Sequence, residues 1–334
     1  QKTFFERWRA TLANHRPNSE QPRREADRGT GAWVLVVEAC MVTPDQDSGS
    51  VRMLAMLEIL RELGCKVAFV ADNLEYRQPY VRQLQQLGVE VWHSPHVSSV
   101  EQLLEREGAL FSHIMFCRHY IAAPYMQAVR RHAPQAKVWF DTVDLHYLRE
   151  QRMAELAGSD EMARAAEKTR EQELRLIRDC DVTLVVSPVE QALLAKEAPG
   201  ARVEVLSNVH EIFGRRRGFS ERSGLMFIGG YQHPPNVDAA IWFAREILPR
   251  VRAELPDLVF HLIGSKAPAE VKALGDLPGV EFHGFVEDIE PFLDGCRLAV
   301  APLRYGAGVK GKVNMSMSYG QPVVATGIAV EGMY

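Results

Sequence analysis

The stretch GAGVKGKVNMSMSYGQPVVAT, residues 306–326, places a glycine-rich turn and two lysines before an expected helix and a short apolar strand. Gly306 and Gly308 allow the backbone to approach a ligand closely, because glycine has no Cβ. The helix that follows offers unpaired N–H groups and the positive end of its dipole, and Lys310 and Lys312 add full charges. The stretch therefore predicts an anion site, suited to a phosphate, inside an α/β unit.

Outward from this stretch, apolar runs typical of strands alternate with amphipathic helices along most of the chain. The runs lie at Val34–Val37, Val67–Val70, Ile114–Phe116, Val138–Phe140, Thr183–Val186, Leu225–Ile228, Val259–Ile263, Val280–Phe282, Leu298–Ala301 and Pro322–Ala325. This alternation predicts an α/β fold with mostly parallel sheets that helices cover on both faces. Two such sheets in tandem favour a ligand in the cleft at the carboxyl ends of their strands.

The length and composition favour two domains, since 334 residues with 46% hydrophobic content exceed what one ordinary core needs. We expect an N-terminal helix and linker over residues 1–31, a first domain over 32–208 and a second over 209–334. The linker is polar and arginine-rich, which predicts an upstream domain or an assembly partner. The second domain stops just after a strand, which predicts that it is truncated.

Charge and cysteine content argue against several classes of function. A net charge of −4 is not that of a general nucleic-acid binder, which needs a basic face. The five cysteines form no CxxC pair, and His93 and His96 have no third ligand nearby, so we expect no metal site. No apolar run is long enough to span a bilayer, and no signal peptide is recognisable. These features favour a cytoplasmic protein.

Several motifs resemble those of GT-B glycosyltransferases of the group 1, or family 4, type. In the second half they are FIGGYQHPPNVDAA at 227–240, HLIGS at 261–265, GVEFHGFVEDI at 279–289, VAPLRYGAGVKGKV at 300–313 and GQPVVAT at 320–326. In the first half, TPDQDSGSVRM at 43–53 and DTVDLHYLRE at 141–150 resemble the acceptor-side domain of that family. The resemblance implies two Rossmann-like, doubly wound domains that face each other across a cleft.

The same resemblance implies a function. Such enzymes transfer a sugar from a nucleotide-diphosphate donor to a hydroxyl, usually with retention of anomeric configuration and without a metal or separate cofactor. The motifs look closest to those of bacterial enzymes for O-antigen, capsule or other surface polysaccharide, so the implied acceptor is a glycan or lipid-linked glycan. The implied location is the cytoplasm, including the inner face of the membrane. A noncatalytic GT-B module in a larger assembly protein and a sugar-nucleotide epimerase are the alternatives.

On the second domain, the resemblance gives the two lysines a catalytic reason. Negative charge grows on the leaving diphosphate as the glycosidic bond breaks, and fixed cations stabilise it. We expect Lys312 to carry most of this role and Lys310 to assist, with surface lysines as the alternative. Further donor contacts are expected from Gly229, Gly230, Phe285, Val286, Arg304, Gly308, Asn314 and Ser316.

The sequence departs from the family pattern in two places. Met315 stands where family members commonly carry the glutamate that grips the donor ribose, so this contact passes to Asn314 or Ser316 or is lost together with activity. Tyr231 and Asn236 stand where basic residues often contact the diphosphate. Diphosphate binding should then depend more heavily on the two lysines and on Arg304.

On the first domain, four residues are expected to reach the cleft. Ser48 and Gly49 open a helix, so their N–H and hydroxyl groups can face the donor; a plain helix cap is the alternative. Asp144 and His146 follow the carboxyl end of a strand. We expect His146 to hydrogen-bond the donor sugar and Asp144 to orient the sugar or the acceptor hydroxyl, with loop hydrogen bonds as the alternative. We name no general base, because the leaving phosphate can accept the acceptor proton.

Overall fold

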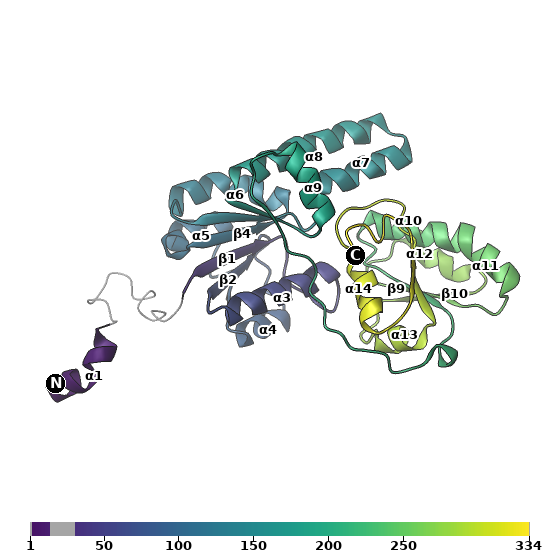
Figure 1. Cartoon of the computed structure of the whole chain (residues 1–334), viewed down its shortest axis with the longest axis horizontal. Coiled ribbons are helices and arrows are strands. Elements are labelled where there is room, and N and C mark those ends of the chain that lie inside the picture. Colours follow the sequence, from purple (N-terminus) through teal and green to yellow (C-terminus); the bar gives the residue numbers. More distant parts are fainter. Residues whose placement is uncertain (1, 14–30, 334) are drawn as a thin grey trace.

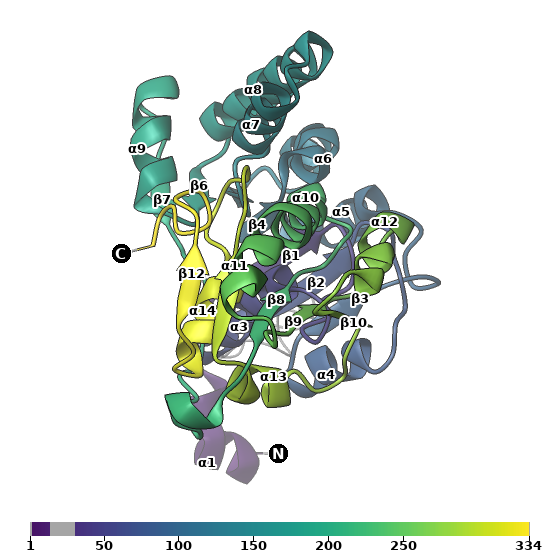
Figure 2. The ribbon, with the colours of Figure 1, turned by 90° about the vertical axis from the view of Figure 1, so that its right-hand side faces the viewer.

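The computed structural model describes residues 2–13 and 31–333 and shows two α/β units, each built on a parallel sheet (Figures 1 and 2). The fold class predicted from the sequence is confirmed. Helix α1 (Lys2–Leu12) precedes the first unit and buries none of its residues. Most of the predicted linker lies outside the described residues, and the predicted domain boundaries remain predictions.

The first sheet has seven strands in the order β3-β2-β1-β4-β5-β6-β7, all parallel. The strands are β1 (Trp33–Glu38), β2 (Lys66–Ala71), β3 (Glu90–Trp92), β4 (His113–Cys117), β5 (Lys137–Asp141), β6 (Val182–Val185) and β7 (Val203–Val205). The order reverses at β1, so the loops after β1 and β4 diverge and leave a crevice at their carboxyl ends.

The second sheet repeats this plan with five parallel strands in the order β10-β9-β8-β11-β12. The strands are β8 (Leu225–Ile228), β9 (Phe260–Ile263), β10 (Val280–Gly284), β11 (Leu298–Ala301) and β12 (Val323–Ala325). Here the order reverses at β8. Its crevice therefore lies between the loops after β8 and β11.

Helices cover both faces of each sheet (Figure 1). Those of the first unit are α3 (Ser48–Glu62), α4 (Tyr80–Gln86), α5 (Val100–Glu107), η1 (Gly108–Leu110), α6 (His119–His132), α7 (His146–Ala157), α8 (Asp160–Asp179) and α9 (Pro188–Glu197). Those of the second are η2 (Phe219–Glu221), α10 (Pro234–Trp242), η3 (Phe243–Ile247), α11 (Leu248–Glu254), α12 (Ala269–Lys272), η4 (Ala273–Asp276), α13 (Glu290–Gly295) and α14 (Gly311–Ser318). No helix in the described ranges is both long and apolar enough to cross a membrane.

Strand β1 shows how the apolar runs build the core. All six of its residues are buried, and their side chains alternate between two clusters on opposite faces of the sheet. Leu35 and Val37 pack on one face, whereas Val34 and Val36 pack on the other. Each such side chain contributes about 1.5–3 kcal/mol through burial. A strand buried on both faces has a continuous apolar sequence, which is why β1 could be predicted from the sequence.

The sequence analysis missed two strands, β3 and β7. Each has three residues and lies at an edge of the first sheet. Edge strands need little apolar surface, and Glu90 and Glu204 interrupt the apolar pattern that the longer strands display. The sequence signal is therefore weak at these edges.

Candidate functional site

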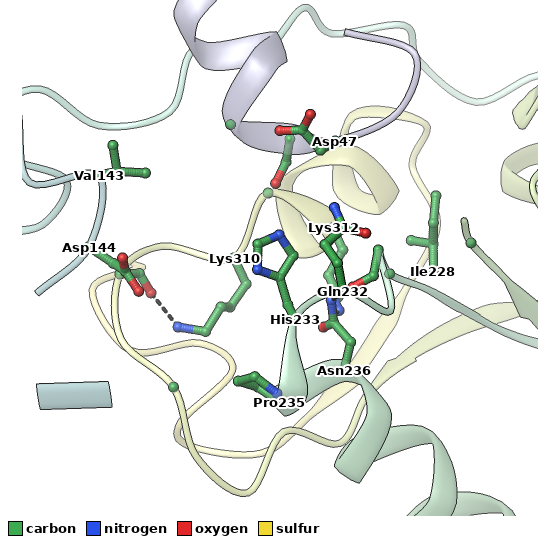
Figure 3. Close-up of a pocket in the computed structure, with 18 of the residues that line it drawn as sticks. Asp47, Val143, Asp144, Ile228, Gln232, His233, Pro235, Asn236, Lys310 and Lys312 are labelled. Atoms are coloured by element: carbon green, nitrogen blue, oxygen red, sulfur yellow. Dashed lines mark hydrogen bonds between the residues drawn. The ribbon is translucent and has the colours of Figure 1, made fainter. Parts of the chain in front are cut away.

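A cavity of about 820 Å³ lies between the two units, at the carboxyl ends of both sheets. Its walls come from the loops that follow β1, β4 and β5 of the first unit and β8, β9, β10 and β11 of the second. Figure 3 shows side chains from both units converging on this space. The cavity has the position that the paired crevices predict.

The second unit places two lysines at the start of α14. Lys310 Nζ donates to the carbonyl oxygens of Ala307 and Gly308 at 2.5 and 2.6 Å. Lys312 Nζ donates to Asn236 Oδ1 at 2.6 Å and lies 4.2 Å from the ring centroid of Phe227. Both lysines line the cavity, as predicted, together with Gly311 at the start of α14.

The electrostatics of the two lysines differ. Burial and, to a smaller extent, the neighbouring charge of Lys310 together lower the pKa of Lys312 to about 7. No carboxylate of the described residues compensates. Burial also lowers the pKa of Lys310, but the negative charges of Asp144 and Glu190 oppose this effect, and the resulting pKa is about 8. Lys312 is therefore the less neutralised cation, and an anion in the cavity would favour its charged form.

The glycine-rich turn before α14 brings the two units into contact. Gly308 has a φ of +70°, and a Cβ there would lie 2.9 Å from the Cβ of Asp144. A Cβ on Gly311 would lie 2.7 Å from the Cβ of Ser48. The sequence analysis explained Gly308 by the approach of a ligand. The structure adds that absent side chains let this turn pack against the first unit.

On the opposite wall, Ser48 and Gly49 form the first turn of α3 and line the cavity. The helix cap is Asp47, whose Oδ1 accepts from Ser50 N at 2.8 Å. The alternative that Ser48 is a plain cap is therefore wrong. The Ser48 side chain instead lies next to Gly311, at the start of α14.

Asp144 and His146 lie on the same wall, where β5 leads into α7. Asp144 pairs with Arg149, and its Oδ1 lies 3.2 Å from His146 Nδ1. Burial favours the neutral form of Asp144, yet the charges of His146, Arg149 and Lys310 together lower its pKa. Burial lowers the pKa of His146 despite the nearby carboxylates of Asp144 and Glu173. Near pH 7 the wall thus presents a carboxylate beside a neutral imidazole.

Buried ion pairs that the sequence analysis did not assign hold this wall in place. Arg52 forms a bidentate pair with Asp141 at 2.6 and 2.9 Å and donates to the Leu206 carbonyl. Arg118 pairs with Glu38 at the end of β1. A signal was available, since Arg118 and Asp141 both stand at the carboxyl end of a strand, where this fold places its functional loops.

The remaining predicted residues divide into two groups. Gly229, Gly230, Phe285 and Val286 line the cavity, whereas Arg304, Asn314 and Ser316 do not. Arg304 pairs with Asp238 and lies over Trp242 on the surface.

The helical period of α14 explains the two other exceptions. Lys312 and Met315 are three residues apart, so they share the cavity face of the helix. Ser316 is fully buried on another face, and its Oγ has no hydrogen-bond partner among the described residues. The prediction that Asn314 or Ser316 replaces the missing glutamate is thus corrected: the cavity meets Met315.

Asn236 stands where a basic residue was expected and has a structural explanation. Its Oδ1 accepts from Lys312 and its Nδ2 donates to the Gly230 carbonyl at 2.8 Å. A Cβ on Gly229 would lie 2.8 Å from Asn236 Cγ. Asn236 thus ties the glycine turn after β8 to Lys312. Tyr231 is buried beside this turn and takes no part in the cavity lining.

Within the described ranges, two groups of side chains have ligand atoms close enough for a metal ion. His119, His146 and Glu173 form the first, beside the cavity. Glu173 also accepts hydrogen bonds from the backbone N–H groups of His146 and Tyr147 at 3.2 and 2.8 Å, so it anchors the start of α7. The second group, His261, Glu281 and His283, lies outside the cavity lining. His93 and His96 belong to neither group.

Comparison with solved structures identifies the class of the fold. Sucrose-phosphate synthase from Thermosynechococcus elongatus superposes with a TM-score of 0.67 at 14% identity, covering 90% of this chain and 82% of that one. TarM gives 0.69 at 10%, covering 90% and 85%. HepE from Anabaena, solved with UDP and glucose, gives 0.59 at 15%, covering 88% and 80%. The chain has the GT-B fold.

The sequence comparison finds a family that the second unit resembles. Residues 222–333 match the family described as glycosyl transferases group 1. No curated protein matches the chain in sequence. The resemblance to group 1 glycosyltransferases of the GT-B fold is thus confirmed, with the family match in the second unit and the fold match along nearly the whole chain.

Proposed function

We propose that the protein is a retaining glycosyltransferase that moves a sugar from a nucleotide-diphosphate donor to a hydroxyl of a surface polysaccharide or glycolipid, without a metal in the reaction. The family match and the GT-B fold support the class of reaction. The donor class is supported by the structure of HepE, which was solved in complex with UDP-glucose.

One observation carries the proposal: the amine of Lys312 lines the cavity with a neutral amide, Asn236, as its hydrogen-bond partner and no described carboxylate to balance its charged form. An unneutralised cation in such a place is costly unless an anion joins it. Lys310 and the N-terminus of α14 lie beside it, and Asp144 faces the same space from the other unit (Figure 3), where His146 also lines the cavity. A diphosphate on the lysine side would place its sugar toward Asp144 and His146.

The chemistry follows from this orientation. The bond between the anomeric carbon and the phosphate oxygen breaks, and the two lysines stabilise the charge that develops on the leaving diphosphate. The acceptor hydroxyl attacks on the same face, and its proton passes to the leaving phosphate oxygen. Neutral His146 can donate to a sugar hydroxyl, and Asp144 can accept from one. These two side chains therefore orient the sugar, and we assign no nucleophile.

Met315 favours a second candidate, a noncatalytic GT-B module in a polysaccharide-assembly protein. This thioether lines the cavity where the resemblance expects a glutamate for the donor ribose. A module of this kind would keep the fold and lose productive donor binding. Substitution can separate the candidates: Met315→Glu should tighten nucleotide-sugar binding if the donor ribose meets this position, with Met315→Leu as the size-matched control.

The deciding experiment is titration calorimetry with a panel of nucleoside diphosphates and nucleotide sugars. Saturable binding of one nucleotide, weakened at least tenfold in Lys312→Ala, is the expected result. Lys272→Ala, on the exposed face of α12, is the matched control and should bind like the wild type. Absence of binding throughout the panel by folded protein would favour the noncatalytic module.

A further inference from the structure

Two histidines and a glutamate meet on one face of the second sheet, at the edge formed by β10 and β9. Glu281 and His283 are two residues apart on β10, and although the strand pairing shifts between Phe282 and Gly284, their side chains meet, with His283 Nε2 3.7 Å from Glu281 Oε2. His261 lies on β9 directly opposite Glu281 in the parallel register. The three side chains are therefore brought together by strand geometry rather than by a flexible loop.

The separations between the ligand atoms fit a metal ion. His261 Nδ1 lies 3.0 Å from His283 Nε2 and 3.3 Å from Glu281 Oε2, and the last two atoms are 3.7 Å apart. A tetrahedral Zn²⁺ with ligands at about 2.0–2.2 Å holds them about 3.3–3.6 Å from one another. The unliganded arrangement is thus within a few tenths of an ångström of the bound one.

The neighbourhood fixes the orientation of the two imidazoles, as a metal site requires. The ring of Phe292 from α13 packs edge-on against both His261 and His283, at centroid distances of 5.7 and 4.8 Å. The side chain of Glu281 is 55% exposed, so an ion can enter and keep a water ligand.

We propose that His261, Glu281 and His283 form a Zn²⁺ site with water as the fourth ligand. Mixed imidazole and carboxylate donors suit Zn²⁺, whereas Mg²⁺ prefers oxygen alone. The ion would tie the edge strand β10 to β9. Phe285 and Val286, which follow β10, line the cavity, so the site would also fix one wall of the cleft. This role is distinct from the metal-free transfer proposed above, and the sequence analysis did not foresee it.

The test uses the whole chain, free of any histidine tag and stripped of metal with a chelator. Zn²⁺ titration should show one site per chain and raise the thermal midpoint by about 5 °C when Zn²⁺ exceeds Kd a hundredfold. Mg²⁺ should do neither. Co²⁺ in place of Zn²⁺ should give the intense visible absorption of a tetrahedral centre. The thermal shift and the Co²⁺ absorption are both independent of glycosyl transfer.

Variants assign the signal to its ligands. His283→Asn and Glu281→Gln should each abolish the Zn²⁺-dependent shift, and circular dichroism checks that both variants fold. His132→Asn, at the end of α6 and in neither cluster, should keep it. Loss of the shift in His119→Asn, with retention in His283→Asn, would move the metal to the cluster beside the cavity and overturn the proposal. Absence of Zn²⁺ binding by the wild type at about 100 μM would overturn it as well.

Discussion

The two walls of the cleft differ in whether their buried charges have a counter-charge. On the first unit, Arg52 is paired with Asp141 in the interior. On the second, Lys312 contacts an uncharged amide, and no described carboxylate pairs with it. A buried ion pair balances its own charge without a ligand and therefore serves the fold, whereas a buried cation without a counter-charge needs an anion to balance it. The comparison separates the residues that hold the cleft from those that use it.

The largest expected effect is on the first wall. Asp141→Leu leaves the guanidinium of Arg52 buried without its counter-charge and should lower the free energy of unfolding by about 3–5 kcal/mol. The exposed pair between Arg170 and Glu167 is the control, because Glu167→Leu should cost less than about 1 kcal/mol. Chemical denaturation followed by circular dichroism compares them. Equal losses would mean that the buried pair has no special structural role.

Substitutions on the second wall should change turnover rather than stability. Lys312→Ala should lower turnover at least tenfold, and up to about 10³-fold, because one charge that stabilises the leaving diphosphate is removed. Lys310→Ala should cost less, since two carbonyl oxygens and the charge of Asp144 already share that ammonium group. Both variants should unfold at the midpoint of the wild type. An equal drop in Lys272→Ala would contradict the assignment.

A pH titration sharpens the same contrast. In the free protein the pKa of Lys312 is about 7, and a bound diphosphate raises it. The favourable contribution is therefore fully present below pH 7 and is lost as pH rises through the pKa of the complex. Between pH 7 and 9 the affinity for a nucleotide sugar should fall by up to about tenfold per pH unit, with proton uptake on binding. Calorimetry in buffers of different ionisation enthalpy measures this uptake, and Lys312→Ala should flatten the profile.

The fold could be predicted because its strands are buried on both faces and therefore read as unbroken apolar runs, as in Val34–Val37. The lysines could be predicted because glycine, charge and helix start coincide in one short segment. The residues that contact the lysines and define their chemistry could not be predicted. Asn236 lies 76 residues before Lys312, and nothing local in the sequence links the two.

The errors have a similar cause. Arg304 lies close in sequence to the lysines, yet Asp238 and the ring of Trp242 keep it on the surface. Ser316 is one residue from the cavity face, and a rotation of about 100° per residue is enough to bury it on another face of α14. Proximity along the chain predicted the segment of the site correctly and failed at the level of single side chains.

The smallest expected effect concerns the connection between the walls. Arg152 of α7 donates to both carboxylate oxygens of Glu331 at 2.6 and 2.7 Å and to the Gly306 carbonyl at 2.6 Å, so it joins the first unit to the turn that carries the lysines. Arg152→Ala should raise the KM for the donor about fivefold, because a partly exposed pair of this kind contributes about 1 kcal/mol. Arg164→Ala, on the exposed face of α8, is the control.

A double-mutant cycle shows whether this connection acts as a unit. Glu331→Gln alone should weaken donor binding in the same direction, since the hydrogen bond from Arg152 is the main cause that lowers the pKa of Glu331. If the pair holds the two walls together, the double variant should be little worse than either single variant. Simple addition of the two effects would instead show that Arg152 acts through Gly306, and that the turn rather than the ion pair links the walls.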